Sequence, residues 1–476
     1  MIKTLLIIAI IYIGILATLS LASRQRQKST ASYLLAGSKL GPVLGLFTFA
    51  ATLFSTFTLI GMPDFFRTHG VGSWIFLAVS DAAMVFGIIW LGAYVRKKAR
   101  NKDFKGLSGL IGDCYQNRFA GFVIFLGAFI FLIPYVSIQI RGIAIFLNAT
   151  FPEALPTWGW ALSMVVVMLI YSETGGLKAI IYSDVLQGIL LLVVIWIASF
   201  VCIAYFGDIQ SMFKKVEQTN QALLSVPGPK NLFTTQFLIA SMLAIVMIPF
   251  TQPQVVTRII IMKSQRSLFR MAIGVGCFAI IIILPTLFLG MYGAVKYPGE
   301  STAVFINKVL IRDQSDSVAA FIIIGLIAAA ISTADSQIFA LGAELRSLLK
   351  GDDKKVMPVT RVAIGFFAVV SLVFSLFSSD QLVLLARTSF AGTALMGPMI
   401  FTGIFSQNKA GMLIPIATLL AMALFVGSLL DVIPGSFWGI RLDICLFTVL
   451  AIIALLSQYA GNKSVPAGDL KKVTDT

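Results

Sequence analysis

Apolar residues run through this chain in stretches of about 20 residues, separated by short polar segments. A helix of that length crosses roughly 30 Å of hydrocarbon. The pattern predicts an all-α polytopic membrane protein with about thirteen transmembrane helices. The predicted spans are 2–22, 41–62, 72–95, 119–149, 156–171, 185–206, 233–257, 271–295, 317–347, 362–378, 381–405, 412–430 and 437–459.

The composition agrees with a membrane protein, because 58% of the residues are hydrophobic and only 12% are charged. The net charge of +15 does not indicate nucleic-acid binding, since the basic residues gather in alternate loops, as in 96–105 and 263–270. We therefore expect a multi-pass protein of the plasma (inner) membrane, surrounded by the lipid bilayer, with no nucleic-acid partner. The charge distribution places the N-terminus outside and the C-terminus in the cytoplasm.

The spans group into two blocks of five, and because five is odd the second block must cross the membrane in the opposite orientation. Inverted repeats of this kind build secondary transporters. The predicted parts are 1–40, an extra N-terminal helix and inner loop; 41–206, the first five-helix repeat; 207–232, an outer loop; 233–405, the second, inverted repeat; and 406–476, two C-terminal helices and an inner tail.

The first helix of each block contains helix breakers. The first block opens at Gly41-Pro42 and its first helix stops at Gly61-Met62-Pro63, and the second block carries Pro249 and Pro253. A proline removes a backbone donor and frees a carbonyl, which is tolerated at membrane depth only where the backbone is buried or lines a cavity. Freed carbonyls suit a sodium ion. The alternative is a simple proline kink with Ser and Thr residues that only pack helices.

A polar run, Ala329 to Ser336, interrupts the apolar span 317–347. At helical pitch Ser332, Asp335 and Ser336 share one face, and Thr333 lies beside it. Polar groups at bilayer depth are costly and indicate function. We interpret this face as a cation site.

These segments resemble the sodium/solute symporter family, over about residues 30–410, with its LeuT-like fold. The resemblance rests on four segments: Ala51-Thr52-Leu53-Phe54-Ser55, Tyr171 to Gln187 with its Gly175-Gly176 turn, Gln252-Pro253-Gln254 to Arg258, and Ala329 to Ser336. It implies a sodium-coupled secondary active symporter of a small organic solute that works by alternating access. It also implies one sodium ion bound by the carbonyls of Ala51, Phe54 and Ala329 and the hydroxyls of Ser332 and Thr333.

The resemblance further suggests a second cation site at Asp184, Asp335 and Ser336. Two carboxylates close together cannot both stay ionised without a cation or a shared proton, so the site holds sodium or a proton. The alternative is that Asp184 caps the following helix and Asp335 pairs with Lys178.

Two charges near mid-depth, Asp81 and Arg141, need partners. They form a salt bridge with each other, or Arg141 binds a substrate carboxylate and Asp81 an ammonium group. Arg387 and Arg441 are competing anion sites. The remaining candidates for solute contacts are Ser55, Thr58, Gln139, Thr251 and Gln252, for which the alternative is ordinary helix–helix hydrogen bonding.

The expected solute carries a carboxylate, as in a monocarboxylate, an amino acid or a sialate-like molecule. Two other classes of function stay open, a transporter-like membrane sensor and a sodium-independent uniporter or channel. An enzyme is not expected, because the sequence offers no nucleophile–base pair and His69 is its only histidine.

Overall fold

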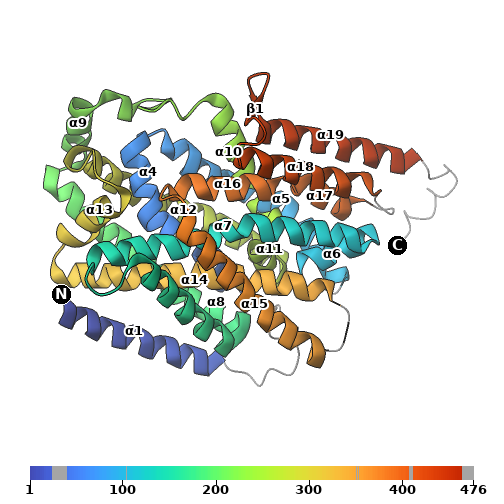
Figure 1. Cartoon of the computed structure of the whole chain (residues 1–476), viewed down its shortest axis with the longest axis horizontal. Helices are drawn as coiled ribbons and strands as arrows, with labels where there is room; N and C mark the ends of the chain where they lie inside the picture. Colours follow the sequence, from blue (N-terminus) through green and yellow to red (C-terminus); the bar gives the residue numbers. More distant parts are fainter. Residues whose placement is uncertain (24–39, 103, 350, 352, 407–410, 464–476) are drawn as a thin grey trace.

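Long apolar helices build the protein, and most of them run along the long axis of Figure 1. The computed structural model describes residues 1–23, 40–102, 104–349, 351, 353–406 and 411–463. Within these residues nine helices are long and apolar enough to cross a membrane, or eleven if each of two bent pairs counts as one span. The predicted spans 156–171 and 412–430 coincide with shorter apolar stretches, Thr157–Ile170 and Leu413–Leu429. The multi-pass helical architecture is confirmed, whereas the count of thirteen is not.

The elements follow the apolar pattern of the sequence in chain order. The first part of the chain forms α1 (Ile2–Ser23), α3 (Pro42–Leu53), η1 (Phe57–Gly61), α4 (Met62–His69), η2 (Ile75–Val79), α5 (Ser80–Asn101), α6 (Leu107–Tyr115), α7 (Arg118–Thr150), α8 (Thr157–Phe206), α9 (Ile209–Thr219) and η3 (Gln221–Leu224). The second part forms α10 (Thr235–Thr251), α11 (Pro253–Ile260), α12 (Gln265–Lys296), α13 (Thr302–Asn307), η4 (Lys308–Arg312), α14 (Asp316–Leu348), α15 (Asp353–Phe377), α16 (Leu382–Ala394), α17 (Gly397–Phe405), α18 (Leu413–Leu429) and α19 (Leu442–Lys463). A small antiparallel hairpin, β1 (Ser436–Phe437) and β2 (Ile440–Arg441), precedes α19.

Both expected helix breaks are present. The chain bends by 57° between α3 and the η1–α4 segment, and by 57° between α10 and α11. Phe54 and Gln252, which lie at the two breaks, have extended backbones, with φ −92° and ψ 119° for Phe54 and φ −100° and ψ 114° for Gln252. Pro253 opens α11, where its missing N–H is not needed by the helix.

Two boundaries differ from the sequence-based expectation. The backbone is helical throughout α8, including 171–184, where a Gly-Gly turn and an inner loop were expected. Leu177, Ile180 and Ile181 are buried at helical spacing, and this apolar stripe favours a helix. The side chains of 171–176 and 179 lie outside the described residues. At the other boundary, helix α4 continues to His69, beyond the end of the predicted span 41–62.

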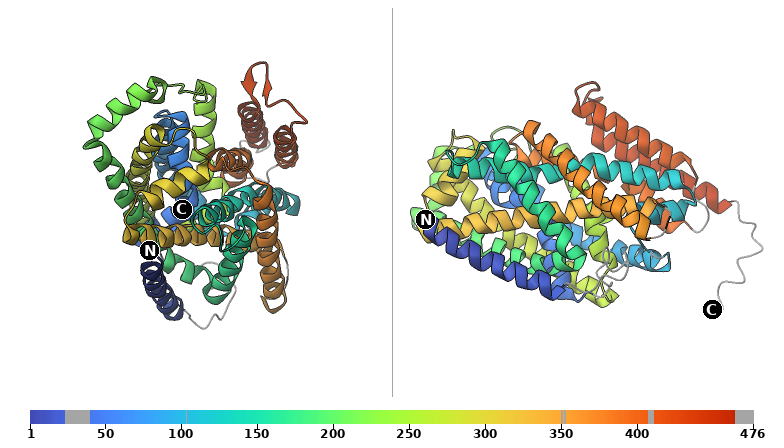
Figure 2. Two further views of the ribbon diagram at one scale, coloured as in Figure 1. Left: turned by 60° about the vertical axis from the view of Figure 1, so that its left-hand side comes forward. Right: turned by 60° about the horizontal axis from the view of Figure 1, so that its bottom comes forward.

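Helix α14 forms the centre of the bundle, and it packs against α1, α3, α6, α7, α8, α11 and α15. Its side chains are buried almost without interruption from Ile322 to Gly342. Helices α18 and α19 pack on each other at one edge of the bundle, and α1 lies along another edge (Figure 2). The polar residues of α14 from Ser332 to Gln337 are therefore buried inside the bundle.

The short helix α6 is tied to the end of α14 by a carboxylate. Glu344 on α14 is buried, and its two oxygens accept hydrogen bonds from the backbone N–H groups of Leu107, at 2.7 Å, and Ser108, at 2.5 Å. Ser347 accepts a third, from the N–H of Gly109 at 2.9 Å. A Cβ at Gly109 would lie 2.9 Å from the Cβ of Ser347, so a glycine is needed for this close approach.

Candidate functional site

The broken end of α3 presents a backbone carbonyl to α14. In an unbroken helix the Ala51 carbonyl would accept from the N–H of Ser55, but that N–H bonds to the Thr58 hydroxyl at 3.2 Å. The Ala51 carbonyl instead accepts from the Thr333 hydroxyl at 2.8 Å. Because the last carbonyls of a helix carry partial negative charge, this junction attracts cations. Two residues predicted to bind the first sodium ion are thus in direct contact.

The second half of this broken span begins with reciprocal caps. The Ser55 hydroxyl accepts from the N–H of Phe57 at 3.3 Å, and the Thr58 hydroxyl accepts from the N–H of Ser55. This is the capping-box arrangement, which satisfies donors at the start of a helix. The predicted solute contacts Ser55 and Thr58 therefore use hydroxyl lone pairs to start the half-helix. The Leu53 carbonyl, at the end of α3, accepts from the Tyr135 hydroxyl at 3.0 Å.

The break between α10 and α11 offers an amide rather than a hydroxyl. The Thr251 hydroxyl donates to the Met247 carbonyl at 2.9 Å, within its own helix. The Gln252 side-chain oxygen accepts from the amide of Gln254 at 2.7 Å. The Gln252 nitrogen Nε2 is buried and has no hydrogen-bond partner among the described residues.

Asp184 on α8 joins the two predicted ion-binding segments. Its Oδ1 accepts from the Ser332 hydroxyl at 2.5 Å and its Oδ2 accepts from the Thr48 hydroxyl at 2.5 Å. The carboxylate is fully buried. Because Asp184 lies within α8 and bonds to other helices, the alternative of a helix cap is wrong. Ser332 faces Asp184, while its neighbour Thr333 faces Ala51.

Arg258 is a site residue for which the sequence suggested no role. Its guanidinium group is 1% exposed and lies 3.7 Å from the Asp184 carboxylate. It donates to the Ser336 hydroxyl at 2.8 Å, to the Thr48 hydroxyl at 3.4 Å and to the Gln254 carbonyl at 3.1 Å. Arg258 ends one of the segments that carry the family resemblance, and it lies one residue beyond the predicted span 233–257.

Asp335 completes the cluster. Both of its carboxylate oxygens are buried, and neither has a hydrogen-bond partner in the part of the chain that the structure describes. The alternative pairing with Lys178 is therefore not seen. Asp335 lies within electrostatic reach of Asp184 and Arg258. Two carboxylates against one guanidinium leave one negative charge in excess when all three are ionised, which favours a further cation.

Arg141 and Asp81 are not partners. The Nε of Arg141 donates to Asp380 at 2.8 Å, and the side chains of this ion pair are 22% and 45% exposed, respectively. The alternative of a salt bridge between Arg141 and Asp81 is wrong, because Asp380, in the loop before α16, pairs with Arg141 instead. Asp81 is buried within α5 and lies within electrostatic reach of Tyr135.

Unpaired polar atoms gather around the first break. A Cβ at Gly142 would lie 2.3 Å from Cγ2 of Thr56, so α7 passes very close to the break at this turn. Gln139, one turn earlier on α7, has a buried Oε1 without a hydrogen-bond partner among the described residues, and the Thr56 hydroxyl likewise has none there. A buried polar atom left unpaired costs about 1–3 kcal/mol, so a bound solute or water that pairs with these atoms is stabilised.

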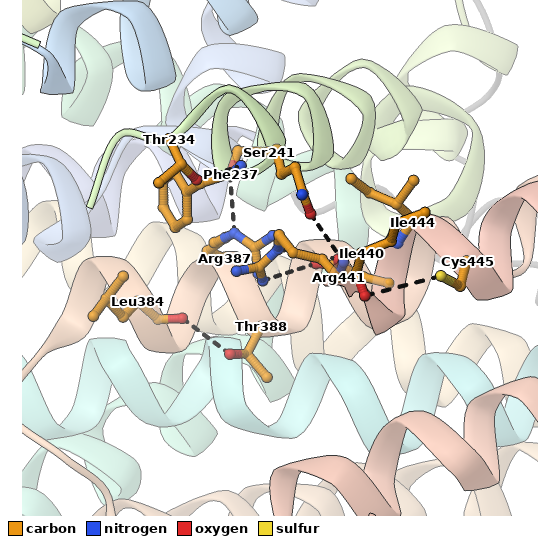
Figure 3. A network of polar contacts seen from close by, with 12 residues as sticks. Thr234, Phe237, Ser241, Leu384, Arg387, Thr388, Ile440, Arg441, Ile444 and Cys445 are labelled. Carbon is orange, nitrogen blue, oxygen red and sulfur yellow. Dashed lines mark hydrogen bonds and ion pairs between the residues drawn. The ribbon is translucent and has the colours of Figure 1, made fainter. Parts of the chain in front are cut away.

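Figure 3 shows the two competing cations, Arg387 and Arg441, close to each other, and both pair with the carboxylate of Asp443. Arg387 donates to Asp443 at 2.6 Å and to Ser241 at 2.9 Å, and Arg441 donates to the same Asp443 oxygen at 3.1 Å. The guanidinium carbon of Arg387 also lies 4.9 Å from the centre of the Phe237 ring. These contacts join α10, α16 and α19, so Arg387 and Arg441 stabilise the bundle.

Among the residues that the structure describes, no group of three or more His, Cys, Asp or Glu side chains could hold a metal ion. Transition-metal sites use clusters of such side chains as ligands. The candidate site instead offers carbonyl, hydroxyl and single carboxylate oxygens. Such hard oxygen donors suit alkali ions.

The family follows from the sequence as a whole. The model of the sodium:solute symporter family matches residues 33–414. The chain belongs to the sodium:solute symporter family. As a member of this family it is a sodium-coupled symporter of a small organic solute, and sodium is its coupling ion.

Relatives of this symporter include bacterial transporters of several solutes. The high-affinity proline transporter PutP of Bacillus subtilis (strain 168) is 25% identical over 449 residues, which cover 86% of this chain and 91% of that protein. The sodium/pantothenate symporter of Haemophilus influenzae is 24% identical, and the match covers 63% of this chain and 62% of that protein.

Solved structures share the fold of this symporter. A Na⁺-coupled sialic acid symporter in a substrate-bound, outward-open state superposes with a TM-score of 0.77 at 17% identity, covering 96% of this chain and 98% of that one. MHP1, a nucleobase-cation-symport-1 family transporter, superposes with a TM-score of 0.59 at 12% identity, covering 93% and 97%. The LeuT-like fold expected from the sequence is confirmed.

Proposed function

We propose that this symporter carries a small carboxylate-bearing solute together with sodium by alternating access around the two broken spans. The observation that carries the proposal is the contact between the Thr333 hydroxyl and the freed carbonyl of Ala51. It brings a hydroxyl and a carbonyl from opposite halves of the chain to one point, where a monovalent cation replaces the hydrogen bond between them.

The first sodium ion is bound by the carbonyls of Ala51, Phe54 and Ala329 and the hydroxyls of Ser332 and Thr333. All five residues are buried. These are neutral donors, which suit an ion that must be released in every cycle.

The second cation is bound by Asp184, Asp335 and Ser336. The support is the excess negative charge of the cluster and the absence of hydrogen-bond partners for the Asp335 oxygens within the described residues. The Asp184 oxygens already accept from hydroxyls, so Asp335 offers the free ligands.

Energetics link the second cation to an anionic solute. One sodium ion gains about 2.3 kcal/mol per 100 mV of membrane potential, and a tenfold sodium gradient adds about 1.4 kcal/mol. A monoanion moved with one sodium ion cancels the voltage contribution and keeps only that of the gradient. With two cations the net transported charge is positive again, and the voltage contribution returns.

The solute lies against the buried polar atoms beside the first break, with Asp81, Gln139 and Gln252 as contacts. Ser55, Thr58 and Thr251 line the same region through their backbone and side-chain surfaces. Arg141 binds a carboxylate only if its ion pair with Asp380 opens. Relatives named for proline and pantothenate and a neighbour named for sialic acid support this class of solute, because each of these molecules has a carboxylate.

The same proposal covers topology. The repeats comprise 41–206 and 233–405, and the protein lies in the plasma membrane with its N-terminus outside. The basic ends of α5 and α12 then face the cytoplasm, in agreement with the charge rule.

The experiment is uptake into proteoliposomes of purified protein, with imposed sodium and voltage gradients, after a thermal-shift screen of amino acids, small acids and sugars. We expect saturable uptake of a carboxylate solute against its gradient only when sodium is present outside. Uptake that equilibrates without sodium indicates a uniporter. Stabilisation by sugars and not by any acid contradicts the carboxylate assignment.

A further inference from the structure

A groove lies on one side of α5, away from the ion-binding cluster. It has a volume of about 960 Å³. Its lining residues come from α5 and from the first residue of α12, and they are Phe86, Ile89, Trp90, Ala93, Tyr94, Arg96, Lys97, Arg100, Asn101 and Gln265. The groove plays no part in the transport cycle proposed above.

The part of the groove nearer the start of α5 is lined by a column of aromatic side chains. Phe86, Trp90 and Tyr94 follow each other at four-residue spacing and therefore lie on one face of α5. Phe86 and Trp90 are each 75% exposed and Tyr94 is 53% exposed. In a membrane-spanning helix such a face contacts lipid chains, with Trp and Tyr enriched toward the interface.

The part of the groove near the end of α5 is lined by basic side chains. Arg96, Lys97 and Arg100 lie within the last turns of α5, and Lys97 and Arg100 are exposed. In the described part of the chain no carboxylate forms a salt bridge with any of the three, in contrast to Arg67, Arg258 and Arg387.

A buried donor points to a ligand at this end. Arg96 is 8% exposed, and its Nε donates to the Met262 carbonyl at 2.9 Å. Its Nη2 is buried and has no hydrogen-bond partner among the described residues. Gln265 begins the long helix α12, whose N-terminal N–H groups add partial positive charge on the same side. A donor held in place by one bond and left open at another is suited to a phosphate oxygen.

The dimensions match one leaflet of a bilayer. Phe86 and Arg96 are ten positions apart in an α-helix, which is about 15 Å along the axis. That is half of the roughly 30 Å hydrocarbon thickness, the depth to which one acyl chain reaches. A free phosphate ion would use the basic end only and would leave the aromatic column without a role.

We infer that this groove binds an anionic phospholipid, with its phosphate on Arg96, Lys97 and Arg100 and an acyl chain along Phe86, Trp90 and Tyr94. The lipid would cover the place where α5 meets the start of α12. Both helices pack against the broken spans. The inference does not depend on the identity of the solute.

The test measures thermal unfolding of the full-length protein in neutral detergent during titration with phosphatidylglycerol. Phosphatidylcholine of the same chain length serves as the uncharged-headgroup comparison, and glycerol 3-phosphate as the soluble headgroup. The variant is Lys97→Gln with Arg100→Gln. The matched control is Arg118→Gln with Arg270→Gln, which removes the same charge from exposed positions at the starts of α7 and α12, outside the groove.

We expect phosphatidylglycerol to raise the unfolding temperature of the native and control proteins more than phosphatidylcholine does. The groove variant lacks two basic residues and should need roughly thirtyfold more phosphatidylglycerol, which corresponds to about 2 kcal/mol. An equal response of groove and control variants overturns the site. Equal stabilisation by phosphatidylcholine overturns the headgroup assignment, and stabilisation by glycerol 3-phosphate alone overturns the lipid. If the double variant cannot be purified in a single folded form, Lys97→Gln is compared with Arg118→Gln by the same criteria.

Discussion

Replacing Arg258 by methionine tests the buried charge cluster directly. Methionine keeps an unbranched apolar stem but removes the guanidinium group, which is 1% exposed and donates to Ser336, Thr48 and the Gln254 carbonyl. The change leaves two buried carboxylates without their cation. Removing one partner of a buried ion pair costs about 3–5 kcal/mol, so we expect a large loss of unfolding free energy at low sodium.

A second substitution restores the charge of the cluster. Arg258→Met leaves two negative charges in excess, and adding Asp335→Asn brings the excess back to one, as in the native cluster. We therefore expect the double variant to be more stable than Arg258→Met alone. Sodium should also stabilise Arg258→Met more than the native protein, and a ligand present at 100 times its Kd adds about 2.7 kcal/mol.

The assay is thermal unfolding in detergent at low and high sodium, with choline replacing sodium so that ionic strength stays constant. Arg118→Met, at an exposed position at the start of α7, controls for loss of a positive charge. A native unfolding temperature for Arg258→Met, or a double variant no more stable than the single one, refutes the reasoning.

Three further outcomes follow from individual contacts. Thr333→Val keeps the side-chain shape but removes the hydroxyl that donates to the Ala51 carbonyl. The sodium concentration for half-maximal uptake should therefore rise about tenfold, which corresponds to roughly 1.4 kcal/mol. An unchanged sodium titration would show that Thr333 is not part of the first ion site. Tyr135→Phe loses the bond to the Leu53 carbonyl and should lower the free energy of unfolding by about 1 kcal/mol, measured by denaturation, whereas native stability would show that water replaces the bond. Backbone N–H donation at the start of α9 lowers the pKa of Asp208 below 3.8, so the ionised carboxylate stabilises that helix at pH values above 3.8, and this stabilisation is lost as the pH falls through the lowered pKa. Hydrogen-exchange protection of α9, corrected for intrinsic rates, should fall over the same pH interval. Asp208→Asn should show no such transition.

The helix breaks were predictable because proline acts locally. Pro253 removes one N–H from one helix whatever surrounds it, and the sequence places it in the middle of an apolar stretch. The contact between Ala51 and Thr333 came instead from family resemblance, since no periodicity relates two segments so far apart in the chain.

Long-range ion pairs were beyond the reach of the sequence. Asp184 meets Arg258 from another helix, and Arg141 meets Asp380 rather than Asp81. Hydropathy fixes how deep a charge lies to within a turn or two, but the partner depends on helix rotation and on where loops return. The role of Ser55 stays a prediction for a different reason, because a serine hydroxyl can cap a helix or bind a solute, and here it accepts from the N–H of Phe57.

The hydrogen bonds between Glu344 and the start of α6 do not involve the side chains of α6. Both bonds to the carboxylate come from main-chain N–H groups, which every residue except proline supplies. A substitution at position 107 or 108 therefore keeps these two bonds if its side chain fits the buried space and it is not proline, whereas a residue at 344 that is shorter or lacks the second oxygen loses at least one of them. If α14 tilts at that end, α6 moves together with it, because the two helices are joined through Glu344.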